Sequence, residues 1–389
     1  MEQTPKLAFV EQALAERAQQ QQLRSLQPLH PIDAVRVTGY GQTLLNFTSN
    51  DYLGLSKHPQ IIAAAQRYTA QYGTGATASR LVSGTYDIHL HLEEQLAAAT
   101  GREAALLLNS GFQANATLLP ALLDRQSLVL CDRLVHNSLI HGIRSSGARF
   151  IRYAHNDLNH LESALQQAVQ QGVHRMAIVT ETVFSMDGDC SDVEALIQLA
   201  NQYGAILYLD DAHAVGVLGQ RGMGLAADRP EVDIVVGTCG KAFGSFGAFV
   251  TCSRSLRQYL INFCPGFIYT TALPPAVIGA IEAALLLIPS LDAERLHLAQ
   301  LSQTLRPELQ ALGYSTAASR SHIVPLVLGS ETRTLHLSDW LKQQGILATA
   351  IRPPTVAAGT SRLRFALSSS HTVEHLQYLI QTIASWTDC

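Results

Sequence analysis

Short apolar runs alternate with helix-like segments between about residue 61 and residue 257. These runs cover residues 104–108, 128–131, 176–180, 205–209, 234–237 and 248–252. Strands that are buried on both faces read as continuous apolar stretches, and helices usually connect parallel strands. The alternation therefore predicts a large α/β domain with a mostly parallel central sheet.

The pattern changes before this domain. Apolar positions at Leu7, Val10 and Leu14 predict an amphipathic helical arm over residues 7–26, which ends before Pro28. Short β-like runs follow at 35–37 and 44–47. We expect residues 1–55 to form an N-terminal helical arm with short strands.

The pattern changes again after the domain. An apolar helix is expected over residues 273–291, and beyond it helical segments flank strand-like runs at 323–328 and 363–367. This order is typical of an α+β unit. We expect a large α/β domain over residues 56–290 and a smaller α+β C-terminal domain over 291–389.

Composition narrows the class of protein. Of the 389 residues 47% are apolar and 15% are charged, and the formal net charge is -4. This fits a soluble globular protein without the basic field that nucleic acid requires. The polar, glutamine-rich N-terminal segment lacks the apolar core of a signal peptide, so we expect a cytoplasmic location.

Two further features limit the alternatives. The apolar stretch at 273–291 contains Pro274, Pro275 and Glu282, which favours a buried helix over a membrane span. The six cysteines are scattered without CxxC or metal-ligand spacing. We therefore expect neither a disulfide framework nor a metal site, and no association with a membrane.

A lysine in a glycine-rich turn is the first candidate for chemistry. Lys241 lies in the sequence GTCGKAFG, directly after the apolar run at 234–237. Ala242 stands where a nucleotide-binding P-loop needs a hydroxyl, and the leading glycine is also missing. A lysine among apolar neighbours is partly desolvated, which lowers its pKa and suits it to form an imine or transfer a proton.

Two carboxylates and a histidine follow the apolar run at 205–209. The sequence LYLDDAH places Asp210, Asp211 and His213 at the carboxyl end of a predicted strand, where ligands bind in open α/β sheets. A pyridine cofactor needs a carboxylate against its protonated ring nitrogen. Spacing alone does not choose between Asp210 and Asp211.

Two more segments could contact such a cofactor. Residues 109–115 (NSGFQAN) follow a strand-like run and begin a helix-prone stretch, whose backbone N–H groups could bind a phosphate. His136 follows the run at 128–131 and offers a flat ring that could stack on an aromatic group. Each signal is weak alone, since turns favour glycine and asparagine and most single histidines have no catalytic role.

Taken together, these segments resemble the α-oxoamine synthases. The shared motifs are NFTSNDYLGL at 46–55, SGF at 110–112, TVFSMDGD at 182–189, DDAH at 210–213 and TCGK at 238–241, and the resemblance extends to Arg364. It implies a fold-type I, aminotransferase-like architecture and pyridoxal 5′-phosphate as the cofactor.

The resemblance also implies roles for individual residues. Lys241 would hold the cofactor as a Schiff base, Asp210 would pair with the ring nitrogen, and His213 would hydrogen-bond the ring hydroxyl oxygen. His136 would stack on the ring. The phosphate and its surroundings would be held by Gly111, Phe112, Ser185 and Thr238, with Thr270 or Thr271 contributed by a partner subunit. A homodimer with shared active sites is implied.

Substrate-binding residues are implied in the same way. Arg364 would grip an amino-acid carboxylate, and the other positions are Arg24, Asn50, His136, Arg352 and Thr355. Residues 350–360 (AIRPPTVAAGT) are similar to the branch of the family that condenses L-alanine with a pimeloyl thioester of CoA or acyl-carrier protein in biotin biosynthesis.

Alternatives stay open within and outside this branch. A glycine C-acetyltransferase, a 5-aminolevulinate synthase or a serine palmitoyltransferase would share the cofactor residues. A non-catalytic partner subunit is disfavoured because Lys241, Asp210 and His213 are all present. Ala357 replaces a common proline, and residues 73–80 are less glycine-rich than in many relatives, which leaves the acyl-chain preference open.

Overall fold

A seven-stranded sheet forms the centre of the computed structural model, which describes residues 6–20 and 22–387. Its strand order is β4-β10-β9-β8-β7-β5-β6, and only β10 runs antiparallel to its neighbours. The strands are Ala104–Leu108 (β4), Leu128–Asp132 (β5), Arg149–Tyr153 (β6), Met176–Glu181 (β7), Ile206–Asp210 (β8), Ile234–Thr238 (β9) and Ala248–Cys252 (β10). The predicted mostly parallel sheet is confirmed.

Six of these strands were predicted from continuous apolar runs. Such runs occur because helices cover both faces of the sheet. Every residue of β4, β5, β7, β9 and β10 is buried. Strand β6 was not predicted, because it lies at the edge of the sheet and Arg149, Ile151 and Arg152 are exposed. An edge strand with one covered face has no continuous apolar run.

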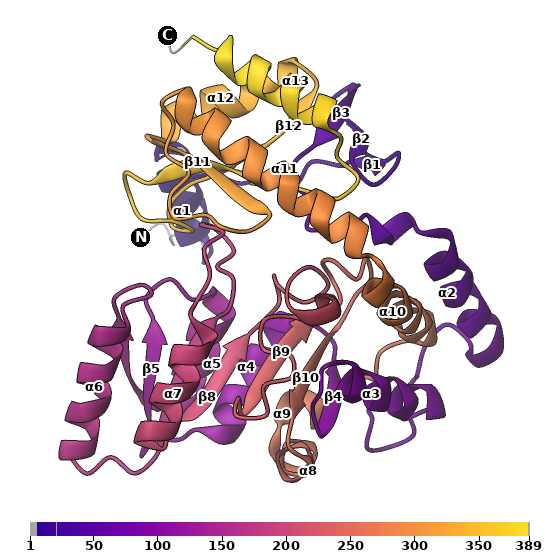
Figure 1. The fold of residues 1–389 in the computed structure, drawn as a ribbon, viewed down its shortest axis with the longest axis vertical. Helices are drawn as coiled ribbons and strands as arrows, with labels where there is room; N and C mark the ends of the chain where they lie inside the picture. The colour runs from indigo at the N-terminus through magenta and orange to yellow at the C-terminus, as the bar shows by residue number, and fades with distance from the viewer. Residues whose placement is uncertain (1–5, 21, 388–389) are drawn as a thin grey trace.

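Helices pack on both faces of the sheet (Figure 1). Leu118 and Leu139 belong to the core on one face, and Leu165 and Ile197 to the core on the other. The helices of this part are Pro59–Tyr72 (α2), Asp87–Ala99 (α3), Gly111–Leu122 (α4), Asn137–Ser146 (α5), Leu158–Gln170 (α6), Val193–Tyr203 (α7), Arg254–Phe263 (α8), Pro265–Ile268 (α9) and Pro275–Leu287 (α10).

A smaller lobe lies beside the carboxyl ends of the parallel strands (Figure 1). Its antiparallel sheet has the order β11-β14-β13. The elements are Asp292–Ala311 (α11), Ile323–Gly329 (β11), Glu331–Gln343 (α12), Ile346–Leu347 (β12), Thr349–Ile351 (β13), Ser361–Ala366 (β14) and Val373–Ala384 (α13). The strand-like runs predicted at 323–328 and 363–367 correspond to β11 and β14.

The N-terminal strands join this smaller lobe. His30–Pro31 (β1), Arg36–Gly39 (β2) and Gln42–Asn46 (β3) form an antiparallel ribbon, and β12 pairs with β3 in parallel. Segments 300 residues apart in the chain thus share one sheet. A hydrogen bond from the Gln42 side-chain amide to the Lys342 backbone carbonyl also joins them. The division into residues 1–55, 56–290 and 291–389 stays a prediction.

The N-terminal helix is shorter than its sequence pattern suggested. It covers Ala8–Gln19 (α1) instead of residues 7–26, and none of its residues is buried. Leu7, Phe9 and Leu14 expose 67%, 67% and 51% of their surface, so in the single chain this apolar face is largely uncovered. Beyond residue 22 the backbone is not helical, consistent with the approach to Pro28.

The apolar stretch at 273–291 forms a buried helix, as expected. Helix α10 begins at Pro275, which suits the first helical position, and Ile278, Ile281 and Leu285 pack into the core. Among the described residues no single helix has the length and hydropathy to cross a membrane. Only the pair 275–290 and 292–311, bent by 76°, passes such a test on length and composition.

Candidate active site

A cavity of about 290 Å³ lies where the large sheet meets the smaller lobe. Strands β7, β8 and β9 contribute residues at their carboxyl ends, and the N-terminus of α4 and strand β14 complete the walls. Ten of the residues predicted from the sequence line this one cavity: Asn50, Gly111, Phe112, His136, Ser185, Asp210, His213, Thr238, Lys241 and Arg364.

Lys241 lies three residues after β9, in a turn that only glycine permits. Gly244 has φ of 63°, and a Cβ there would lie 2.3 Å from the Ser56 nitrogen. Burial lowers the pKa of Lys241 to about 8, although Asp210 and Glu181 act in the opposite direction. Within the described chain no hydrogen bond or ion pair holds Nζ, so an amine that deprotonates near neutral pH faces the cavity.

The side chains of the two adjacent aspartates point to different sides of the strand. Asp210 lines the cavity, and its carboxylate accepts hydrogen bonds from Asn115 Nδ2 at 2.6 Å and the Ala212 amide at 3.0 Å. Asp211 points to the other side, where it contacts the Thr182 hydroxyl and the Leu225 and Ala226 amides. Side chains alternate across an extended backbone, so only Asp210 can meet a ligand in this cavity.

His136 enters the cavity from the loop after β5. Its backbone N–H donates to Glu181 Oε1 at 2.6 Å, and its Nδ1 accepts from the Ser138 amide at 3.3 Å. Burial lowers the pKa of His136, as Lys241 does, while Asp210 opposes the shift. A neutral imidazole whose Nδ1 accepts carries its proton on Nε2, so His136 can donate from Nε2.

The N-terminus of α4 forms another wall. Ser110 caps the helix by accepting the Gln113 amide at 3.1 Å, and Gly111 and Phe112 are its first residues. Free amides and the helix dipole at this end favour an anion such as a phosphate. Thr238, at the end of β9, adds a hydroxyl that accepts from the Gly240 amide at 3.3 Å.

Arg364 reaches the cavity from β14 and is buried. Its Nε donates to the Ser185 carbonyl at 2.5 Å, and its Nη2 donates to Asn50 Oδ1 at 3.2 Å. No carboxylate pairs with it among the described residues, whereas nearby Arg362 pairs with Asp187. A buried guanidinium without an acid partner is suited to bind an anionic ligand.

Sequence reasoning missed several lining residues. Glu181 ends β7 beside Asp210 in the sheet register, and burial and Asp210 raise its pKa well above the ordinary value. Asn115 holds Asp210 and also accepts from the Tyr208 hydroxyl at 2.8 Å. The rule that strand carboxyl ends face the ligand would have pointed to Glu181. Nothing local marks Asn115, which lies inside a helix.

A partly buried histidine, His155, connects two loops of the site from outside the cavity. His155 Nδ1 contacts Asp132 Oδ1 at 2.9 Å, and Nε2 contacts Asp189 Oδ2 at 2.7 Å. Ionised carboxylates only accept hydrogen bonds and a neutral imidazole has one N–H, so hydrogen bonds from both nitrogens to carboxylates require the cation. Burial would lower the pKa of His155, but the two aspartates outweigh it and raise the pKa to about 10. The cation ties the loop before His136 to the loop that carries Ser185.

Five predicted residues lie outside this cavity. Arg24, Arg352 and Thr355 line a second cavity of about 550 Å³, where Arg24 Nη2 donates to Thr355 Oγ1 at 3.0 Å. This cavity shares no lining residue with the first. Thr270 accepts from Asn109 Nδ2 at 2.9 Å, and the Thr271 carbonyl accepts from the same group. The role of Thr270 and Thr271 in a partner's site stays a prediction.

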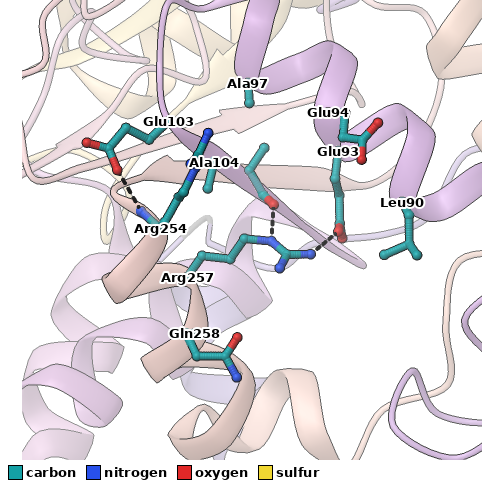
Figure 2. Close-up of a pocket in the computed structure, with 10 residues that line it drawn as sticks. Leu90, Glu93, Glu94, Ala97, Glu103, Ala104, Arg254, Arg257 and Gln258 are labelled. Carbon is teal, nitrogen blue, oxygen red and sulfur yellow. Dashed lines mark hydrogen bonds and ion pairs between the residues drawn. The ribbon is translucent and has the colours of Figure 1, made fainter.

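A third cavity, of about 460 Å³, lies between α3 and α8 (Figure 2). Buried Glu93 is held at 2.7 Å by Arg257 and at the same distance by Arg80. Arg257 also donates to the Ala105 carbonyl at 2.8 Å. Glu93, Arg257 and Arg80 thus pair with one another and join α3, α8 and β4, so none of these three charges is left for a ligand.

The lining of the Lys241 cavity fits pyridoxal phosphate. Lys241 supplies an unpaired amine, and Asp210 supplies a carboxylate for a pyridinium nitrogen. The start of α4 supplies amides for a phosphate. The described residues contain no cluster of histidine, cysteine, aspartate or glutamate that could hold a metal.

Comparison with known proteins agrees with this fit. The family model for class I and II aminotransferases matches residues 42–383. A serine palmitoyltransferase solved with pyridoxal phosphate superposes with a TM-score of 0.92, at 24% identity and 98% coverage of both chains. Fold, site and family model therefore define a fold-type I pyridoxal-phosphate enzyme.

More similar relatives narrow the family. The 8-amino-7-oxononanoate synthase of Gluconacetobacter diazotrophicus is 51% identical over 371 residues, which cover 93% of each chain. The structure of 8-amino-7-oxononanoate synthase from Francisella tularensis has a TM-score of 0.76 at 28% identity, covering 88% of this chain and 97% of that one. The chain belongs to the 8-amino-7-oxononanoate synthase family.

Proposed function

We propose that this protein condenses L-alanine with a pimeloyl thioester, with loss of carbon dioxide, to form 8-amino-7-oxononanoate in biotin biosynthesis. Family membership supports this activity. Within the site, Arg364 carries the proposal: a buried guanidinium without an acid partner in the described chain faces the same cavity as the unpaired amine of Lys241. An amino acid offers the carboxylate that Arg364 lacks.

The chemistry supplied by bound pyridoxal phosphate is an electron sink for bonds broken at the substrate Cα. Asp210 would stabilise the positive charge on the ring nitrogen. Lys241 removes the proton from the alanine Cα, for which a pKa of about 8 is well matched to neutral pH. It returns a proton to the same carbon once carbon dioxide has left.

Arg364 and His136 act on the two substrates. Arg364 holds the alanine carboxylate while the Cα bonds to the thioester carbonyl carbon and the C–S bond breaks. The sulfur leaves as a thiolate, which takes a proton from solvent. His136 can stack on the cofactor and donate from Nε2 to the carbonyl oxygen, where negative charge develops. The carboxylate then leaves as carbon dioxide.

The second cavity supports an acidic acyl substrate. Arg24 and Arg352 give it positive charge, whereas Lys342 pairs with Asp339 of the same lining at 2.6 Å. Leu335 and Leu347 give it an apolar wall. A pimeloyl chain is apolar along its length and ends in a carboxylate. We assign Arg24, Arg352 and Thr355 to that carboxylate end.

A homodimer with shared active sites is part of the proposal. Val82, Phe246 and Tyr269 expose 80%, 53% and 82% of their surface in the single chain, and Phe112, at the edge of the cavity, exposes 49%. Large exposed apolar side chains favour burial by another subunit, and Phe112 extends this exposed set to the cavity. Sedimentation velocity of the holoenzyme tests this, and a monomer would contradict it.

Thiol release tests the proposed reaction. Alanine, glycine and serine are each paired with pimeloyl, acetyl, succinyl and palmitoyl thioesters, and pimeloyl is offered on both CoA and acyl-carrier protein. We expect alanine with a pimeloyl thioester to give the highest kcat/KM. Preference for glycine with acetyl or succinyl would instead indicate a glycine C-acetyltransferase or a 5-aminolevulinate synthase. Lys241→Ala is the inactive control.

A further inference from the structure

A fully buried tyrosine lies between the residue assigned to the substrate carboxylate and the histidine assigned to the cofactor. Tyr52 has no exposed surface. Its hydroxyl lies 2.7 Å from His213 Nδ1, 2.9 Å from Asn50 Oδ1 and 3.3 Å from Arg364 Nη2. One oxygen atom thus joins three residues that line the cavity.

The hydroxyl of Tyr52 carries one proton but has two neighbours able to accept it. If the proton goes to His213 Nδ1, the neutral imidazole carries its own proton on Nε2. If the proton goes to Asn50 Oδ1, His213 donates from Nδ1 to the tyrosine oxygen, and Nε2 becomes an acceptor. The choice at Tyr52 therefore sets which nitrogen of His213 is protonated.

Charges around His213 keep its ring neutral. Burial lowers the pKa of His213 well below its ordinary value, and neighbouring groups act in the same direction: Lys241, Arg364, His322 and His136. His322 packs edge-on against Tyr52, with ring centroids 4.0 Å apart, and hydrogen-bonds neither Tyr52 nor His213. Only the two neutral tautomers of His213 are then available.

Arg364 biases the choice between these tautomers. Its Nη2 donates to both Asn50 Oδ1 and the Tyr52 oxygen, over 3.2 Å and 3.3 Å. Both contacts are long and give way to the stronger bond that a guanidinium makes with a carboxylate. Asn50 Oδ1 already accepts from the Tyr52 hydroxyl at 2.9 Å while it also accepts from Arg364. Once the arginine turns to a carboxylate, Asn50 Oδ1 and the tyrosine oxygen each lose a competing donor, so Asn50 becomes a better acceptor for Tyr52 and the tyrosine oxygen a better acceptor for His213.

We propose that Tyr52 is a positioning residue that couples occupancy of the carboxylate site at Arg364 to the tautomer of His213. This inference rests on the proposed roles of Arg364 and His213. An empty carboxylate site favours His213 protonated on Nε2, which donates to the ring hydroxyl oxygen. A bound carboxylate favours the Nδ1 tautomer, whose Nε2 accepts and keeps that oxygen protonated.

Propionate is a suitable probe, because it has the carboxylate of alanine but no amine to react with the cofactor. The visible absorbance of the holoenzyme is titrated with pH, with and without saturating propionate. We expect propionate to raise the midpoint of the absorbance change by about 0.5–1 pH unit, from the net worth of one hydrogen bond. Competition against alanine gives the inhibition constant of propionate independently.

Variants separate the coupling from simple binding. In Tyr52→Phe the shift should disappear, while propionate still competes with alanine. Asn50→Leu, which removes the competing acceptor, should also abolish the shift and serves if Tyr52→Phe folds poorly. Tyr153→Phe, a buried tyrosine on β6, is the matched control and should behave as the wild type.

The outcomes are distinct. A propionate-induced shift that persists in Tyr52→Phe overturns the coupling, as does competition by propionate without any shift in the wild type. Both results leave the proposed reaction intact. If propionate neither competes nor shifts the midpoint, the role of Arg364 is wrong and the coupling falls with it. The coupling is supported if propionate shifts the absorbance midpoint in the wild type and in Tyr153→Phe but not in Tyr52→Phe or Asn50→Leu.

Discussion

Removing the partly buried cation at His155 should destabilise the protein by an amount that depends on pH. The replacement His155→Ala leaves Asp132 and Asp189 facing each other, with side chains 0% and 5% exposed. Two buried carboxylates without a cation are costly, and breaking a buried ion pair on one side typically costs about 3–5 kcal/mol.

The pKa of His155 gives a second route to the magnitude. It rises from 6.5 to about 10 on folding, because two aspartates outweigh burial. At about 1.4 kcal/mol per pH unit this shift is worth on the order of 5 kcal/mol. Since the folded pKa is raised, the stabilisation is complete below pH 6.5 and is lost as the pH rises towards 10. At pH 7.5 about 3 kcal/mol should remain.

Urea unfolding of the holoenzyme measures this difference between pH 6.5 and 10. The stability gap between wild type and His155→Ala should narrow as pH rises. His174→Ala, at an exposed histidine, is the matched control and should change stability by less than about 0.5 kcal/mol at every pH. A gap that stays constant or widens with pH would refute a charged His155.

Three further predictions concern the cavity. Cofactor-free protein should take up pyridoxal phosphate faster as pH rises through about 8, because the unprotonated amine of Lys241 is the nucleophile; the growth of visible absorbance measures this rate, and Lys241→Ala should show no such growth. Arg364→Ala should raise the alanine KM by about 10- to 150-fold, the worth of a charge-assisted hydrogen bond, and an unchanged KM would exclude its contact with the carboxylate. Asp210→Asn should lower kcat by roughly 100-fold or more. Asp211→Asn should lower the thermal unfolding temperature and leave the affinity for the cofactor unchanged.

Local sequence patterns predicted much of the fold. Strands β4, β5, β7, β9 and β10 are buried throughout, so their apolar runs were visible in the chain. Strand β6 was not predicted, and helix α1 was predicted to extend beyond Gln19. Both features depend on which neighbouring segments pack against them, and a local sequence pattern does not contain that information.

The sequence by itself determined the chemistry-bearing groups: a lysine in a glycine turn, carboxylates at a strand end and a helix N-terminus. The local geometry of these groups depends on residues only a few positions away in the chain. Spacing did not separate Asp210 from Asp211 and only the family resemblance favoured Asp210, which the structure shows facing the cavity while Asp211 does not. Tertiary structure alone decided that two aspartates raise the pKa of His155 and that Tyr52 meets Arg364 across 312 residues. The physical reason is that burial and charge depend on which distant segments pack around a side chain.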